Sequence, residues 1–108
     1  MLNTITLVGN LGGDPETFYT SDGDPIAKFN LAFNSSPKKT CWVKVVAFGK
    51  LAESTEKYLK KGNRIGIIGT LDQDSWEKDG QKRSVHQLIA RSYEFIKVDF
   101  EDGDATPF

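Results

Sequence analysis

The stretch Cys41-Trp42-Val43-Lys44-Val45-Val46-Ala47-Phe48-Gly49 decides the fold, because its side chains alternate between two kinds. One set is small and apolar: Cys41, Val43, Val45 and Ala47. The other set places large rings beside a cation: Trp42, Lys44, Val46 and Phe48. Because successive side chains of a strand point to opposite faces, the stretch predicts a strand whose small face fills the inside of a β-barrel.

Similar patterns on either side of this stretch predict the rest of the sheet. Alternation predicts further strands over residues 3–8, 26–34 and 64–71, and a last one over 82–98. Asp79-Gly80 marks a hairpin between residues 74–78 and the last strand. A short extended piece is expected around residues 17–20, and a polar loop over 34–39.

One convincing helix is predicted over residues 50–61. Leu51, Thr55, Tyr58 and Leu59 share a face there, and Gly62 is expected to cap its end. The order is therefore three strands, one helix and two strands. This order predicts an all-β protein with an OB-fold, a five-stranded Greek-key barrel with its helix between strands 3 and 4.

The composition is that of one soluble globular domain. The chain has 108 residues, of which 38% are hydrophobic and 27% charged. It has no apolar run of about 18 residues and no visible export signal, so a cytoplasmic location is expected. Cys41, the single cysteine, is expected to be a small buried hydrophobic residue.

Charge is distributed unevenly along the chain. The formal net charge is −1, but four of the 15 acidic residues lie in the last ten positions. Residues 1–98 therefore carry 14 basic side chains against 11 acidic ones. The pattern indicates an anion-binding body over residues 1–98 and a separate acidic tip over 99–108. The alternative on charge alone is an ordinary solvated surface with a frayed acidic end.

The face that carries Trp42, Lys44 and Phe48 is the first candidate site. Exposed rings can stack on any base, and Lys44 can neutralise a nearby phosphate. The Cα atoms of Trp42 and Phe48 would lie ~20 Å apart along the strand, so the two rings would mark two points on a long path. The alternative is that both rings belong to a second core layer or to an oligomer contact.

The predicted hairpin around Asp79-Gly80 is the second candidate site. Trp76 stands in it close to three basic residues, Lys78, Lys82 and Arg83. Three further lysines could extend the basic track: Lys38 and Lys39 in the polar loop, and Lys50 at the helix start. Each of these lysines could equally be an ordinary solvated surface charge.

The sequence contains no recognisable catalytic, metal or cofactor motif. His86, the only histidine, has no nucleophile motif beside it. Residues 9–13 lack the Gly-Lys-Ser/Thr spacing of a phosphate loop. Asp72 and Asp74 are interpreted as hairpin acids that aid turns and solubility. We therefore expect a protein that is not an enzyme and that needs no cofactor.

The last residues have a composition of their own, with acids followed by an apolar end. Phe108 could enter a small pocket on a partner while its terminal carboxylate and Asp104 meet basic side chains. We expect Asp102, Asp104, Pro107 and Phe108 to bind the partner. The alternative is an end of the chain without a role.

Three stretches together resemble the bacterial single-stranded DNA-binding protein family. They are Leu7-Val8-Gly9-Asn10-Leu11-Gly12-Gly13-Asp14-Pro15-Glu16, Trp42-Val43-Lys44-Val45-Val46-Ala47-Phe48-Gly49-Lys50-Leu51-Ala52-Glu53 and Tyr58-Leu59-Lys60-Lys61-Gly62. The resemblance implies an OB barrel, usually a homotetramer, that wraps unpaired DNA in the nucleoid during replication, recombination and repair. It also implies base stacking at Trp42, Phe48 and Trp76, and DNA contacts at Lys44, Lys50 and Lys61. The acidic tip would dock onto replication and repair proteins.

The chain departs from that family at three places. The loop over residues 34–40 is short and has no aromatic, the Gly/Pro/Gln-rich linker before the tip is missing, and Ala105-Thr106 replaces a single Ile. The runner-up hypothesis is a primosome-type OB-fold adaptor, which would act mainly through protein contacts. The short loop and the modest basic excess favour the adaptor, whereas the three aromatics and the tip favour the DNA-binding protein.

Overall fold

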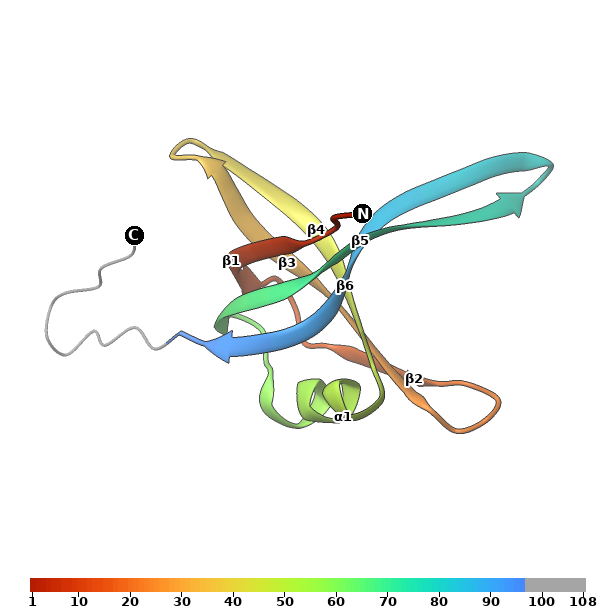
Figure 1. Cartoon of the computed structure of the whole chain (residues 1–108), viewed down its shortest axis with the longest axis horizontal. Helices are drawn as coiled ribbons and strands as arrows, with labels where there is room; N and C mark the ends of the chain where they lie inside the picture. Colours follow the sequence, from red (N-terminus) through yellow and green to blue (C-terminus); the bar gives the residue numbers. More distant parts are fainter. Residues whose placement is uncertain (97–108) are drawn as a thin grey trace, which may run out of the picture.

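The computed structural model describes residues 1–96, which form six strands and one helix. The strands are β1 (Ile5–Leu11), β2 (Glu16–Tyr19), β3 (Pro25–Ser36), β4 (Lys39–Phe48), β5 (Arg64–Lys78) and β6 (Gln81–Phe95). The helix α1 (Gly49–Tyr58) lies between β4 and β5 (Figure 1). Helix placement and strand content agree with the predicted OB-fold.

Five of the strands close into a ring in the order β1-β5-β6-β4-β3. The ring closes where β3 returns to β1, with Asn10 opposite Ala32 and Leu11 opposite Leu31. β4 and β6 run parallel, whereas the other neighbours are antiparallel. The four-residue β2 pairs only with β3, outside the ring, so the short extended piece expected around residues 17–20 is a sixth strand.

Several strand ends differ from the prediction, and the hairpins are longer. β1 continues through Gly9 to Leu11, because the chain stays extended until it has closed the ring. The polar loop expected over residues 34–39 is mostly strand, since β3 and β4 pair nearly to their turn. β5 is one strand from Arg64 to Lys78, and its hairpin with β6 projects from the ring (Figure 1).

The helix ends earlier than its sequence pattern predicts. Leu59 leaves the helix in an extended conformation and is buried. The next residues form a turn that docks on β1, where the Gly62 N–H donates to the Leu11 carbonyl at 2.9 Å. Gly62 has a positive φ of 88°, so it serves this turn and does not cap the helix itself.

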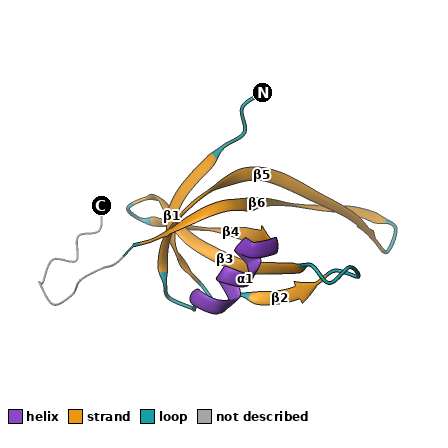
Figure 2. Ribbon diagram, turned by 60° about the horizontal axis from the view of Figure 1, so that its bottom comes forward, coloured by secondary structure: helices purple, strands orange, loops and turns teal. Residues whose placement is uncertain are grey.

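The core lies inside the ring, and α1 lies against β3 and β4 (Figure 2). Its largest fully buried apolar side chains come from β3, β4, β5 and β6: Leu31, Val45, Ile65, Ile67 and Leu88. The helix contributes Ala52 and Thr55. The hydroxyls of Thr55 and Tyr93 share a hydrogen bond of 2.9 Å, which ties α1 to β6. Burial raises the pKa of Tyr93 to about 12.

Two predictions for the β4 alternation are wrong. Val46 was expected on the exposed face beside Lys44, but it is 3% exposed because Lys28 of β3 and Ile89 of β6 flank it. Cys41 was expected to be buried, but it is partly exposed because the β3–β4 hairpin extends past the ring. The Cys41 thiol donates a hydrogen bond of 3.5 Å to the Ser35 hydroxyl.

Gly69 tests the packing of the ring, because it lies where the β5–β6 register shifts. A Cβ at this position would meet the Ile89 carbonyl oxygen and the Leu88 side chain. Gly69→Ala should therefore lower the free energy of unfolding by ~1–3 kcal/mol, the usual cost of overpacking. Gly13→Ala is the matched control, since a Cβ there meets nothing within 4 Å. Equal urea midpoints for the two variants would contradict the packing.

Candidate functional site

The candidate site is the side of the sheet that faces away from the core, called here the outer face. It is formed by alternate residues of β3 and β4 together with their neighbours on β6. Its transverse rows are Ile26 beside Phe48, Lys28 beside Val46 and Ile89, Asn30 beside Lys44 and Gln87, and Ala32 beside Trp42. Trp42 and Phe48 are 62% and 50% exposed, so they are not part of a second core layer within this chain.

Trp42 rests on the backbone of the loop after β1. A Cβ at Gly12 would meet the six-membered ring of the indole, so only glycine leaves room for Trp42 in this position. The Gly12 N–H donates to the Asn30 carbonyl at 2.9 Å, which fixes the loop against β3. A groove of about 410 Å³ runs beside the indole, with Lys28 and Asn30 among its lining residues.

The β5–β6 hairpin brings together part of the second candidate site. Trp76 is 45% exposed and lies directly opposite Arg83. Lys78 follows Trp76 by two residues, so alternation places it on the same face as Trp76 and Arg83. Lys82 lies opposite Glu77, which places it on the other face of the hairpin. The hairpin therefore presents one ring and two cations together.

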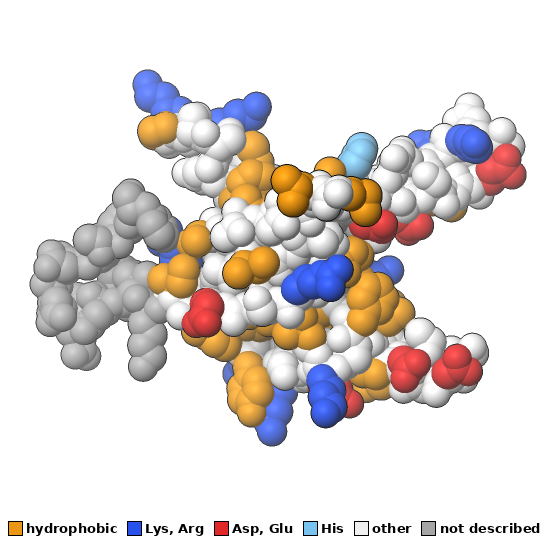
Figure 3. All heavy atoms as spheres, in the orientation of Figure 1, with side chains coloured by type: hydrophobic (Ala, Val, Ile, Leu, Met, Phe, Trp, Pro, Cys, Tyr) orange, Lys and Arg blue, Asp and Glu red, His pale blue; other side chains and the backbone are white. Residues whose placement is uncertain are grey.

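The remaining predicted lysines are exposed and lie at three separate places. Lys38 and Lys39 are at the end of the β3–β4 hairpin, Lys50 is in the first turn of α1, and Lys61 is in the turn after α1. The Lys61 backbone N–H donates to the Asp14 carboxylate at 2.8 Å. Figure 3 shows basic side chains near the ends of both long hairpins. The cations do not form one compact cluster.

Sequence reasoning gave Asp72 and Asp74 only a role in turns and solubility, and it did not place them or Gln87 on the outer side of the sheet. Asp72 lies opposite Gln87, and the Gln87 amide donates to its carboxylate at 3.0 Å. Asp74 follows one row further along β5, before Trp76. Acidic side chains are visible at the foot of the hairpin (Figure 3). Their positions two and four residues before Trp76 were the available signal, because alternation puts Asp72, Asp74 and Trp76 on one face.

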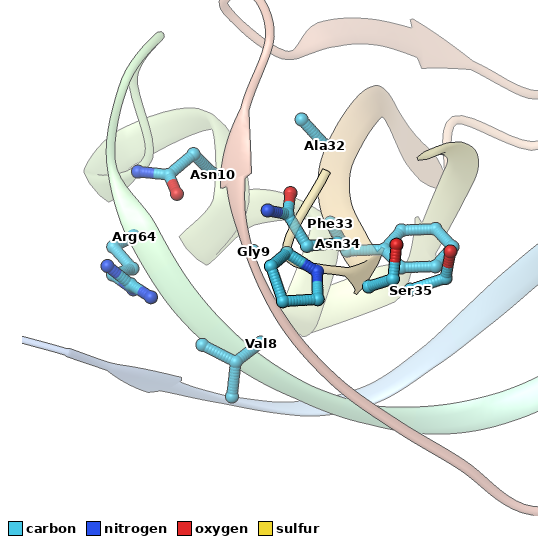
Figure 4. Close-up of a pocket in the computed structure, with 10 residues that line it drawn as sticks. Val8, Gly9, Asn10, Ala32, Phe33, Asn34, Ser35 and Arg64 are labelled. Carbon is cyan, nitrogen blue, oxygen red and sulfur yellow. The ribbon is translucent and has the colours of Figure 1, made fainter. Parts of the chain in front are cut away.

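The larger pocket of the described chain lies elsewhere, between β1 and the end of β3. It has a volume of about 690 Å³, and Asn10 and Arg64 face Phe33, Asn34 and Ser35 across it (Figure 4). None of the predicted site residues lines this pocket. Arg64 is the only charged side chain among its lining residues.

Two features of other kinds of site are absent from residues 1–96. No group of three or more metal-ligating side chains comes together within this range. No helix in the described chain is long and apolar enough to cross a membrane. The predicted partner-binding residues Asp102, Asp104, Pro107 and Phe108 lie outside the described residues.

Comparisons with known proteins agree on one family. Residues 2–96 match the model of the Single-strand binding protein family. A single-stranded DNA-binding protein of Wolinella succinogenes is 41% identical, over 99% of this chain and 78% of the relative. Single-stranded DNA-binding protein 1 of Xylella fastidiosa is 36% identical, over 88% of this chain and 77% of the relative.

A solved structure supports the same grouping. The chain from the Plasmodium falciparum SSB complex with ssDNA superposes with a TM-score of 0.80 at 26% identity. The match covers 90% of this chain and 97% of the solved one.

The contact between Trp42 and Gly12 can be tested by fluorescence. In a Trp76→Phe background Trp42 is the only tryptophan, and Gly12→Ala should push its ring off the loop and into solvent. The expected result is a red shift of the emission and stronger quenching by acrylamide. Gly13→Ala in the same background serves as the control, and identical spectra for both variants would refute the contact.

Proposed function

The chain belongs to the single-strand binding protein family, and from this premise we propose that it binds and protects single-stranded DNA without reading its sequence. The observation that carries the proposal is the exposure of Trp42, Phe48 and Trp76 on the outer sides of the strands. Large exposed rings outside a filled core leave flat surfaces that an unpaired base can cover.

Stacking on these rings supplies the sequence-independent part of the affinity. Every base has a flat face, and one base stacked on one aromatic ring contributes about 1–3 kcal/mol by alanine substitution. Trp42 and Phe48 both lie on the outer face of β4, six residues apart. At ~3.3 Å per residue they are too far apart to flank one base, so successive parts of one strand would stack on them.

Contacts with phosphates supply the salt-dependent part of the affinity. Lys44 lies between the two rings of β4, and Arg83 lies beside Trp76. On the outer side of the sheet, Asp72 and Asp74 lie between the row of Lys44 and the row of Arg83. Their carboxylates would repel phosphates there. Each phosphate that Lys44 or Arg83 neutralises should make the affinity more dependent on salt.

The proposed activity makes and breaks no covalent bond, and it needs no cofactor. Coating of unpaired strands would serve replication, recombination and repair, and would place the protein at the nucleoid. Lys38, Lys39, Lys50, Lys61, Lys78 and Lys82 are proposed as further phosphate contacts. All six are exposed and can reach a strand that extends beyond the outer face.

The proposal also covers the assembly of several copies and the docking of partner proteins. We propose a homotetramer, in which contacts between copies would cover exposed apolar side chains such as Ile68, Leu71 and Phe95. The acidic tip over residues 99–108 would dock onto replication and repair proteins. Its carboxylates Asp102 and Asp104 would meet basic side chains, and Pro107 and Phe108 would enter a pocket.

The DNA-binding proposal predicts a specific order among three alanine variants. Trp42→Ala and Trp76→Ala should each weaken oligo-dT binding by about 1–3 kcal/mol, because each removes a stacking surface. His86→Ala should leave the affinity unchanged. Fluorescence titration measures the affinity, since stacking quenches tryptophan emission. The logarithm of the binding constant should also fall with the logarithm of salt, by about 0.7 per neutralised phosphate.

Two results would contradict this proposal. Equal affinities for all three variants would remove the stacking assignment. A Kd for DNA in the high micromolar range, together with tight binding of a replication protein, would select the adaptor hypothesis.

The docking role of the tip predicts that partner binding can be lost while DNA binding is kept. A chain that lacks residues 104–108 should no longer retain replication and repair proteins in a pull-down, and its affinity for oligo-dT should be unchanged or higher. The reason is that loss of the Asp104 carboxylate takes away one negative charge that repels DNA. The complete chain, assayed in parallel, is the control. Undiminished retention of partners by the shortened chain would refute the docking role.

A further inference from the structure

The β2–β3 hairpin extends the outer face past Phe48. Phe48 of β4 lies opposite Ile26 of β3, and Ile26 lies opposite Phe18 of β2. The three side chains therefore form one transverse row on the same side of the sheet. Phe18 and Phe48 are two strands apart, which is about 10 Å at the usual strand spacing.

Phe18 combines an exposed ring with a nearby cation. The side chain is 47% exposed, although it lies in a regular strand. The Lys28 ammonium lies 5.4 Å from the centre of the ring, and Lys28 is held there by its place on β3, opposite Glu16. This combination of an aromatic ring and a cation also occurs on the β5–β6 hairpin, where Trp76 lies opposite Arg83.

A groove connects this pair with Trp42. The groove of about 410 Å³ beside the indole has Glu16, Lys28 and Asn30 in its lining, so it extends from Trp42 to the cation that covers Phe18. Asp14 also lines it, and its carboxylate accepts the Lys61 backbone N–H. A strand in this groove would pass from one ring to the other.

We propose that Phe18 and Lys28 form a further nucleotide-binding position, in which a base stacks on the Phe18 ring and Lys28 neutralises its phosphate. The inference rests on the proposed binding of single-stranded DNA. It adds a second direction in which the bound DNA strand can leave β4. From Trp42 on β4 the strand runs along the groove past Asn30 and Lys28 toward the β2–β3 hairpin.

The first charged side chain that the outer face carries beside β4 differs between the two directions. Toward β5 the outer side carries the carboxylates Asp72 and Asp74, which repel phosphates. Toward β2 it carries Lys28, whose cross-strand neighbour Glu16 is the one acid of that row. The other acids of the hairpin, Asp22 and Asp24, lie in its turn, beyond the last paired residues.

Phe18→Ala and Tyr19→Ala form the matched pair for the test. Tyr19 is the next residue, is also exposed, and points to the opposite face of β2. With an oligo-dT of about 16 nucleotides, Phe18→Ala is expected to raise the Kd roughly tenfold, the loss of one stacked base. Tyr19→Ala should leave the Kd unchanged, and Phe18→Tyr should retain the affinity because it keeps the ring.

Lys28→Gln and Lys57→Gln form a second pair that does not depend on Phe18. Lys57 lies 5.3 Å from the centre of the Tyr58 ring, a similar cation–aromatic pair that stands on α1. Lys28→Gln should reduce the salt slope of oligo-dT binding by about 0.7, the value for one phosphate contact. Lys57→Gln should leave the slope unchanged.

The outcomes separate this inference from the proposed function. If Trp42→Ala weakens binding while Phe18→Ala behaves as Tyr19→Ala and Lys28→Gln keeps the full slope, the position at Phe18 is overturned and DNA binding stands. If the unaltered protein fails to bind oligo-dT at low salt, both are overturned. Thermal unfolding of each variant shows that the compared proteins are equally folded.

Discussion

The structure depends on small side chains filling the inside of the ring. Val45 and Ala47 are fully buried beside Leu31, Ile67 and Leu88, and together they occupy the space that the five strands enclose. Because side chains alternate across a strand, a filled interior leaves the intervening residues of β4 on the other side of the sheet. The same constraint that makes the core therefore puts large rings in contact with solvent.

Much of the fold follows from local sequence patterns, and the parts that do not follow are non-local. The strands β3 and β4, the Asp79-Gly80 turn and the helix between strands are found where the sequence predicts them, although the predicted burial is wrong at Val46 and Cys41. The parallel pairing of β4 with β6 has no local signal, because it joins residues far apart in the chain. The burial of Val46 likewise depends on neighbours across the sheet, Lys28 and Ile89.

The candidate site shows the same division. Trp42, Phe48 and Trp76 are predictable because a large ring at an outward position of an alternating strand stands out in the sequence. Phe18 is not, since β2 is only four residues long and gains its place on the outer face through pairing with β3. Alternation alone puts Asp72 and Asp74 on the face of Trp76, but the place of Asp72 beside Gln87, in the row of Lys44, follows only from the register.

The central claim is that the exposed rings are the surface on which unpaired DNA lies. Nuclear magnetic resonance of the two tryptophan indole N–H groups tests it most directly, because Trp42 and Trp76 report separately on the outer face and on the β5–β6 hairpin. Titration with oligo-dT should shift both indole signals, while amides around the pocket lined by Asn10 and Arg64 stay in place. Unmoved indole signals together with shifted pocket amides would contradict the account.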